Sequence, residues 1–123
     1  MYNKVFLIGR LTRDPEVRVT ASGISLARFT VAVDRSGNRE NKITDFINIV
    51  VWRRTAEIAG QYLKKGKLVS IEGALRIDEY EKNGQTREWV EVVAENFQML
   101  DRQSDNAMGA PQDQFQTSQE FTN

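Results

Sequence analysis

Five apolar, β-branched runs recur along the first hundred residues and are separated by polar segments. They are VFLIGRL (5–11), LARFTVAV (26–33), FINIVVW (46–52), LVSIEGALRI (68–77) and WVEVVA (89–94). Branched and aromatic side chains pack well on the pleated surface of a sheet, and runs of this length are typical of strands. We therefore expect each run to form a β-strand.

The segment between the third and fourth runs, TAEIAGQYLKKG (55–66), has helical spacing instead. Its apolar residues lie on one face of a helix: Ile58, Ala59, Tyr62 and Leu63. Thr55 is expected to cap the N-terminus, and Lys64 and Lys65 in the last turn, followed by Gly66, form a typical helix stop. The sequence thus predicts three strands, one helix and two more strands.

This order of elements is that of an OB-fold. We expect an all-β protein with one helix, folded as a five-stranded Greek-key barrel whose exposed sheet face and loops bind oligonucleotides or oligosaccharides. With 123 residues, 40% of them hydrophobic, the chain has material for one core, and we assign this domain to residues 1–102. Residues 103–123 are Gln-rich and polar without periodicity, so we expect a disordered tail there.

The dipeptide Asn83-Gly84 between the last two runs predicts a tight hairpin, because a type I′ turn needs positive φ at both central residues. Pairing of Lys82 with Gln85 then sets the register of the two strands. Three further pairs share one side of the hairpin: Tyr80 with Arg87, Asp78 with Trp89, and Arg76 with Glu91. The aliphatic residues take the other side, which we expect to face the core: Leu75, Ile77, Val90 and Val92. Past Ala94 the alternation slips, which predicts a β-bulge.

The stretch TDFINIVVWRR (44–54) carries two different sets of side chains on its two faces. Alternation puts one set in the core: Ile47, Ile49 and Val51. The other face holds the remaining residues of the run: Phe46, Asn48, Val50, Trp52 and Arg54. Two large rings beside an amide and a guanidinium suit neither a dry core nor an ordinary wet surface, so we expect this face to meet a ligand or a neighbour.

The composition excludes several kinds of chemistry. Without cysteine the chain forms no disulfide, and without histidine as well, zinc and iron lack their usual ligands. Histidine is also the commonest general base near neutral pH, and the carboxylates form no motif. We therefore expect neither an enzyme nor a metal or organic cofactor. No apolar run approaches the roughly 20 residues of a membrane span, so we expect a cytoplasmic protein without a membrane partner.

The net charge of zero hides a division along the chain. All 17 Lys and Arg lie in residues 1–102 with 14 of the 17 acids, which makes the body 17 minus 14, or plus 3. Residues 103–123 hold the other three acids and no base, so the tail is minus 3. A modestly basic body permits a nucleic-acid partner without demanding one.

Four aromatic residues on two of the expected strands are candidates for stacking on unpaired bases: Phe46, Trp52, Tyr80 and Trp89. Every base has a flat π-face, so such rings hold single-stranded nucleic acid of any sequence while arginines neutralise its phosphates. Phe46 and Trp52 lie about 20 Å apart along an extended strand, with Asn48 between them as a further candidate. The alternative is that the rings pack under a loop or in a subunit interface.

The candidates for phosphate contacts are basic residues on these and neighbouring segments: Arg54, Arg76, Arg87, Lys65, Lys4 and Arg28. A lone charge such as Lys4 or Arg28 is usually just solvated, and Lys65 equally complements the C-terminus of the helix. The loop 34–45 is long for a hairpin connection and holds three more basic residues: Arg35, Arg39 and Lys42. This loop either closes over DNA or is a flexible tip.

Three segments of the chain resemble the bacterial single-stranded DNA-binding proteins: NKVFLIGRLTRDPEVR (3–18), DFINIVVWRRTAEIAGQYLKKG (45–66) and IEGALR (71–76). The likeness covers nearly all of residues 1–100, and its spread over separate segments in the same order makes it more specific than any one motif. The resemblance implies an OB-fold homotetramer that coats single-stranded DNA during replication, recombination and repair. It implies no enzymatic activity and no cofactor.

The resemblance also carries roles to six positions. Base-stacking aromatics of that family match Phe46, Trp52 and Tyr80. Basic residues that it uses for binding match Arg54, Lys65 and Arg76. Trp89 is supported only by the register of the hairpin.

Three departures from the family pattern matter. Residues 34–43 contain no aromatic where the family commonly has one, so one stacking platform is expected to be missing. Arg76 is followed by Ile77, Asp78 and Glu79 in place of further basic residues, so we expect weaker or more salt-sensitive binding there. The chain stops at EFTN without the acidic, hydrophobic tip that recruits partner enzymes, so we do not expect partners to bind through the tail.

The sequence therefore predicts a sequence-tolerant binder of single-stranded DNA, acting in replication, recombination, repair or DNA uptake. The departures suggest a specialised copy, serving DNA uptake, a phage or a plasmid, or else a trimmed chain. The first strand begins almost at the terminus, and its exposed edge is expected to pair subunits into a homotetramer. The alternative function is an OB-fold adaptor of a replication complex, in which the same rings dock a protein.

Overall fold

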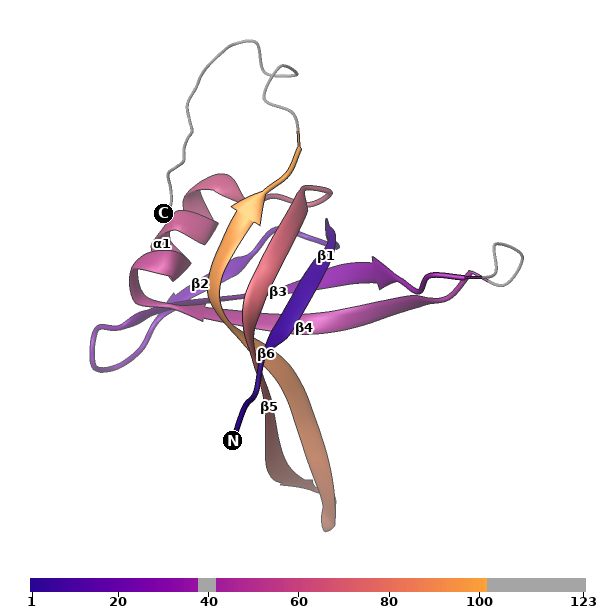
Figure 1. The fold of residues 1–123 in the computed structure, drawn as a ribbon. Helices are drawn as coiled ribbons and strands as arrows, with labels where there is room; N and C mark the ends of the chain where they lie inside the picture. Colours follow the sequence, from indigo (N-terminus) through magenta and orange to yellow (C-terminus); the bar gives the residue numbers. More distant parts are fainter. Residues whose placement is uncertain (38–41, 102–123) are drawn as a thin grey trace.

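Six strands and one helix follow one another along the chain in the computed structural model, which describes residues 1–37 and 42–101 (Figure 1). They are β1 (Val5–Leu11), β2 (Glu16–Val19), β3 (Ser25–Asp34), β4 (Thr44–Trp52), α1 (Arg53–Tyr62), β5 (Leu68–Lys82) and β6 (Gln85–Met99). The predicted tail, 103–123, and Arg39 of the predicted loop lie outside the described residues. The described residues contain no helix that is both long and apolar enough to cross a membrane.

The strands form one sheet in the order β1-β5-β6-β4-β3-β2, and a further pairing of β1 with β3 closes it on itself. All pairs are antiparallel except β4 with β6, which run parallel through Ile49↔Val92 and Val50↔Val93. At the closure, a Cβ on Gly9 of β1 would lie 2.5 Å from the carbonyl oxygen of Ala32, so this strand crossing needs glycine. The ring of strands confirms the expected all-β barrel with one helix.

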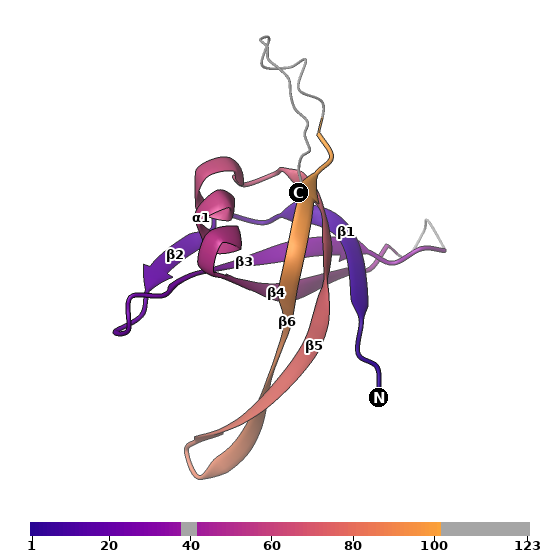
Figure 2. The ribbon, with the colours of Figure 1, turned by 60° about the vertical axis from the view of Figure 1, so that its left-hand side comes forward.

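The core consists of the inward side chains of the barrel and one face of α1, which covers one end of the barrel (Figure 2). The inward residues of β4 behave as predicted, with Ile49 and Val51 fully buried and Ile47 packed against them. From the helical segment, Ala56, Ala59 and Leu63 complete the same core. Burial of this single cluster accounts for the fold of a domain of this size.

The prediction of five strands missed β2. All four of its side chains are exposed, so no buried alternation marks it in the sequence. It forms because its backbone pairs with β3, from Glu16↔Arg28 to Val19↔Ser25. An edge strand of this kind is held by hydrogen bonds to its neighbour more than by burial of side chains.

The predicted bounds of the helix were also wrong at both ends. α1 begins at Arg53, directly after β4, with Trp52 as an extended N-cap residue that makes no side-chain cap, so Thr55 lies inside the first turn. The helix ends before the lysines because Leu63 adopts an extended conformation and anchors in the core. Lys64 and Lys65 therefore lie in the turn beyond the helix.

The hairpin of β5 and β6 has the predicted register, with Lys82 opposite Gln85 and Arg76 opposite Glu91. Asn83 and Gly84 have φ of 53° and 76°, as a type I′ turn requires. The predicted bulge is present as well: Gly73 pairs with Ala94 but Glu72 pairs with Asn96, which leaves one extra residue in β6.

The back of the hairpin is not core, which corrects the prediction for most of its aliphatic residues. Val92 is buried, but three others are exposed: Leu75, Ile77 and Val90. The far half of the hairpin extends beyond the barrel, so none of the other described elements covers its inward side (Figures 1 and 2). Alternation placed these residues on the correct face, but the face itself is open.

Candidate nucleic-acid interface

Directly opposite residues of neighbouring strands share a face, so the pairing registers define one surface that crosses four strands. We call this surface the outer face. It holds residues of β3, β4, β5 and β6: Arg28, Thr30, Phe46, Asn48, Trp52, Arg76, Asp78, Tyr80, Arg87, Trp89 and Glu91. Most of the predicted binding residues therefore lie on one side of the sheet.

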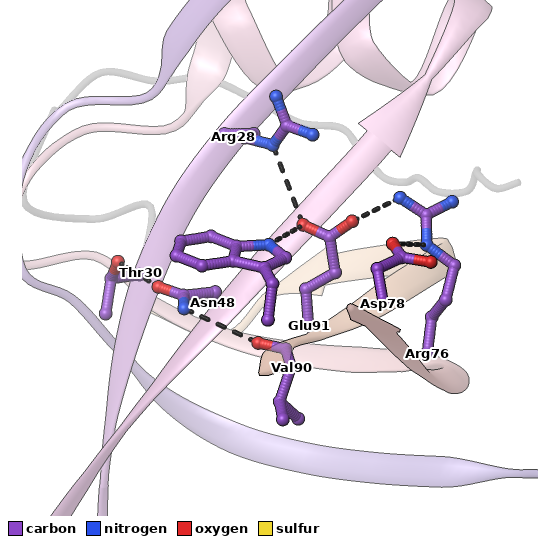
Figure 3. A network of polar contacts seen from close by, with 8 residues as sticks. Arg28, Thr30, Asn48, Arg76, Asp78, Val90 and Glu91 are labelled. Carbon is purple, nitrogen blue, oxygen red and sulfur yellow. Dashed lines mark hydrogen bonds and ion pairs between the residues drawn. The ribbon is translucent and has the colours of Figure 1, made fainter. Parts of the chain in front are cut away.

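The two rings of β4 are accessible from solvent. Phe46 is 65% exposed and Trp52 is half-buried beside its cross-strand partner Leu26. Asn48 lies between the rings and is fixed there, because Thr30 Oγ1 donates to Asn48 Oδ1 at 3.3 Å and Asn48 Nδ2 donates to the carbonyl of Val90 at 3.5 Å (Figure 3). Neither ring is sealed in the core of the barrel.

Glu91 lies at the centre of the outer face and is only 1% exposed. Arg76 Nη2 donates to its Oε2, Arg28 Nε lies 3.6 Å from its Oε1, and Trp89 Nε1 donates to Oε1 at 3.0 Å (Figure 3). A buried carboxylate is costly unless charged and hydrogen-bonding groups surround it. Strands β3, β5 and β6 each supply one such group.

The prediction of the site missed Glu91. The feature of the sequence that could have indicated Glu91 was the hairpin register, which places this residue opposite Arg76 and two residues from Trp89. The third partner, Arg28, comes from β3, and no local pattern connects it to the hairpin. The structure thus joins Arg28, which as a lone charge carried little information, to the two hairpin candidates.

The tip of the hairpin carries a further ring and a further base. Tyr80 and Arg87 lie directly opposite each other, and both are exposed on the outer face. Within residues 1–37 and 42–101, Arg87 makes a single long hydrogen bond of 3.4 Å to Gln85, and its side chain is exposed. Trp89, nearer the barrel, is also exposed.

The outer face continues past Trp52 into a shallow depression of about 220 Å³ between β2 and β3. Its lining consists of Glu16, Arg18, Leu26 and Arg28. Arg18 Nη2 lies 2.5 Å from Glu16 Oε2, and this hydrogen bond lowers the pKa of Glu16 below its ordinary value. Glu16 is therefore ionised at neutral pH and offsets one of the two arginine charges.

Three predicted basic residues lie apart from the outer face or at its margin. Lys4 is paired with Glu95 at 3.1 Å and Glu72 at 3.4 Å, and the hydrogen bond to Glu95 is the main reason that its pKa is raised. Lys65 is exposed in the turn after α1, where its backbone N–H donates to Asp14 Oδ1. Arg54 is exposed at the start of α1. Their contacts with a ligand remain predictions.

The described parts of the loop between β3 and β4 are held by ion pairs at its base. Arg35 donates two hydrogen bonds to Asp45, at 2.9 and 3.1 Å, which lowers the pKa of that carboxyl group. Lys42 Nζ lies 3.6 Å from Asp34 Oδ2. Both cations are therefore partly neutralised before any ligand arrives, and closure of this loop over DNA remains a prediction.

This arrangement of rings, guanidinium groups and a fixed amide is suited to binding. Planar rings stack on bases, and half-exposed guanidiniums donate to phosphate oxygens. Within residues 1–37 and 42–101, no group of three or more His, Cys, Asp or Glu could hold a metal ion.

Comparisons with known proteins all find similarity to single-strand binding proteins. The profile of the single-strand binding protein family matches residues 2–100. The "Single-stranded DNA-binding protein 2" of Listeria monocytogenes is 41% identical over the whole chain and 79% of its own length. The "Single-stranded DNA-binding protein 2" of Streptococcus agalactiae is 48% identical over 88% of this chain and 84% of its own length. Among solved structures, a Plasmodium falciparum SSB complex with ssDNA matches with a TM-score of 0.76 and 25% identity, over 82% of this chain and 96% of that one.

Proposed function

The chain belongs to the single-strand binding protein family, and from this membership we propose that it binds and coats single-stranded DNA without strong sequence preference. The observation that carries the proposal is the outer face, where accessible rings and arginines from four strands lie on one side of a barrel. Family membership also confirms the expectation of a binding protein without enzymatic activity. It does not favour the adaptor alternative.

We propose that bases stack first on the rings of β4. Phe46 and Trp52 are about 20 Å apart on a strand that the core holds from behind, so they form a fixed platform for several nucleotides. The strand of DNA then continues across Asn48 and Trp89 toward Tyr80. Phosphates along this path meet the arginines of the outer face and its margin: Arg28, Arg54, Arg76 and Arg87.

The proposal requires unpaired bases, because a duplex hides the faces on which the rings stack. The test is a titration of the full chain with oligo-dT, followed by tryptophan fluorescence. Both tryptophans contribute to the outer face, so quenching is expected at low salt, and a duplex of equal length should compete poorly. An unchanged signal at low salt would contradict the proposal, and efficient competition by duplex would point to charge alone.

We propose further that the protein assembles through β1, with a homotetramer as the expected state. Residues 5–10 pair with β5 on one edge, and among the described residues β3 pairs with β1 only at Arg10 and Leu11, so most of the other edge is open to a second copy. Phe6 and Ile8 are exposed on the outward side of the same strand. A free edge beside exposed apolar side chains is a self-complementary surface suited to a two-fold interface.

We also propose a cellular role for the protein. Single strands are exposed during replication, recombination, repair and DNA uptake, and we propose that the protein acts in one or more of these processes in the cytoplasm. The names of the two bacterial relatives described above refer to binding of single-stranded DNA.

A further inference from the structure

The charges around Glu91 cancel. Arg28 and Arg76 bring two positive charges to the centre of the outer face, and Glu91 with Asp78, whose Oδ2 lies 3.2 Å from Arg76 Nε, brings two negative ones. A cluster without net charge is unexpected at a surface that binds a polyanion, because net charge is the usual source of affinity for phosphates.

Carboxylates face one edge of each guanidinium group. Arg76 Nη2 donates a hydrogen bond to Glu91 Oε2. Arg76 Nε lies 3.2 Å from Asp78 Oδ2 and Arg28 Nε lies 3.6 Å from Glu91 Oε1, and both contacts are ion pairs; the buried Arg76 Nε has no hydrogen-bond partner among the described residues. Their side chains are nevertheless 47% and 41% exposed. No hydrogen bond joins Nη1 of either arginine to another residue in the described part of the chain. Each half-exposed guanidinium therefore keeps N–H donors accessible to a ligand besides those in the contacts drawn in Figure 3.

The same carboxylate holds the ring of Trp89. Its indole N–H donates to Glu91 Oε1, the oxygen that also faces Arg28 Nε. One buried group thus sets the placement of a stacking ring and two phosphate donors relative to one another. Preorganised donors need less side-chain ordering when the ligand arrives.

We propose that Glu91 is a positioning residue for single-stranded DNA, which makes this cluster bind phosphates through directed hydrogen bonds instead of net charge. The proposal rests on the function proposed above. DNA bound here keeps the ion pairs of Glu91 intact and adds phosphate oxygens on the outward edges of the guanidiniums. Because the cluster contributes no net charge, it contributes little to the salt dependence of binding.

The test is the affinity of the full chain for oligo-dT at several salt concentrations, for the wild type and Glu91→Gln. Gln keeps the shape and an acceptor for Trp89, but it frees one positive charge and releases the guanidiniums. The slope of log K against log salt should become steeper by roughly 0.7, the value for one charge on a single strand. Between about 50 and about 200 mM salt the variant should lose about 2.6-fold in affinity relative to the wild type.

Glu88→Gln is the matched control. Glu88 lies on the same strand but on the opposite face, opposite Glu79, and makes no ion pair within residues 1–37 and 42–101. This change removes the same charge, so an unspecific effect of net charge would steepen both slopes alike. We expect the slope of the control to equal that of the wild type.

A third variant separates position from charge. Arg28→Lys keeps the charge and replaces a half-exposed side chain, so the variant is expected to fold. It therefore tests the proposal even if thermal unfolding shows that Glu91→Gln is not folded. A lysine carries its three donors on one freely rotating ammonium group, so it lacks the fixed planar fork that directs a guanidinium toward a phosphate. We expect an unchanged salt slope with affinity several-fold lower, and unchanged affinity would overturn the proposal.

The outcomes separate the two proposals. Parallel lines for the wild type and Glu91→Gln would show that Glu91 only supports the structure and would overturn its positioning role, while leaving the DNA-binding function in place. If the wild type itself does not bind oligo-dT, the proposed function fails, and the role of Glu91 fails with it.

Discussion

Strand β4 and the far half of the β5–β6 hairpin have the same two-sided pattern but different surroundings. Each carries aromatic and polar groups on the outer face and aliphatic residues on the back. Behind β4 the aliphatic Ile49 is 1% exposed, whereas behind the hairpin Ile77 is 52% exposed. The comparison teaches that alternation assigns residues to faces, while burial depends on whether a second layer of the fold lies behind them.

The difference has consequences for binding. The rings of β4 stand on a strand with β3 on one side, β6 on the other and the core below. The rings of the hairpin, Tyr80 and Trp89, stand on a part of β5 and β6 that pairs with no further strand among the described residues, and a two-stranded hairpin is marginal by itself. We therefore expect the β4 platform to contribute the larger share of the stacking energy.

The largest expected effect is on assembly of the protein. If a second copy covered the back of the hairpin, the contrast between a buried face behind β4 and an open face behind the hairpin would no longer hold. Ile8→Glu should reduce the molar mass measured by light scattering to that of a smaller assembly, because an unpaired carboxylate at an interface costs several kcal/mol. Ile77→Glu is the control and should leave the mass unchanged. Dissociation by Ile77→Glu would show that the hairpin back is an interface.

The next effect is on stability and uses the same residue type in both regions. Ile49→Ala removes buried methyl groups and should lower the free energy of unfolding by about 2 to 5 kcal/mol. Ile77→Ala, on the open back of the hairpin, should lower it by less than about 1 kcal/mol. Chemical denaturation measures both, and equal losses would mean that the hairpin back is covered in solution.

The smallest effect compares the two tryptophans of the outer face. Trp52→Ala should weaken binding to oligo-dT, oligo-dA and oligo-dC alike by roughly 1 to 3 kcal/mol, the range established for stacking aromatics in single-stranded DNA-binding OB-folds. Trp89→Ala should cost less, because its ring stands on the hairpin. Fluorescence anisotropy with labelled oligonucleotides measures both. A loss confined to one base, or a larger loss for Trp89→Ala, would refute the expected order.

The fold was predictable where local rules suffice. The helical spacing around Ile58 and the turn at Asn83-Gly84 are encoded within a few residues, so the presence of one helix before the last two strands and the hairpin register followed from them. The sequence did not predict strand β2 or the start of the helix at Arg53, because neither is encoded by the local sequence alone. Both depend on a neighbouring strand, β3 in the first case and the end of β4 in the second.

The candidate site was predictable in part for the same reason. Phe46, Trp52 and Tyr80 follow from alternation and from a family resemblance, and all three lie on the accessible outer face. Glu91 was read only as a partner of Arg76 in the register. Its burial depends on Arg28, which β3 brings to it from another part of the chain.

By itself the sequence determined which residues share a face and which strands form a hairpin, because side-chain alternation and turn geometry are properties of the local backbone. Only the tertiary structure decided which of those faces are covered and which charges meet. Closing the barrel brings together β3, β5 and β6, buries one carboxylate among groups from all three, and leaves the far hairpin without a layer behind it. Burial and electrostatics depend on neighbours in space, and those neighbours exist only once the chain has folded.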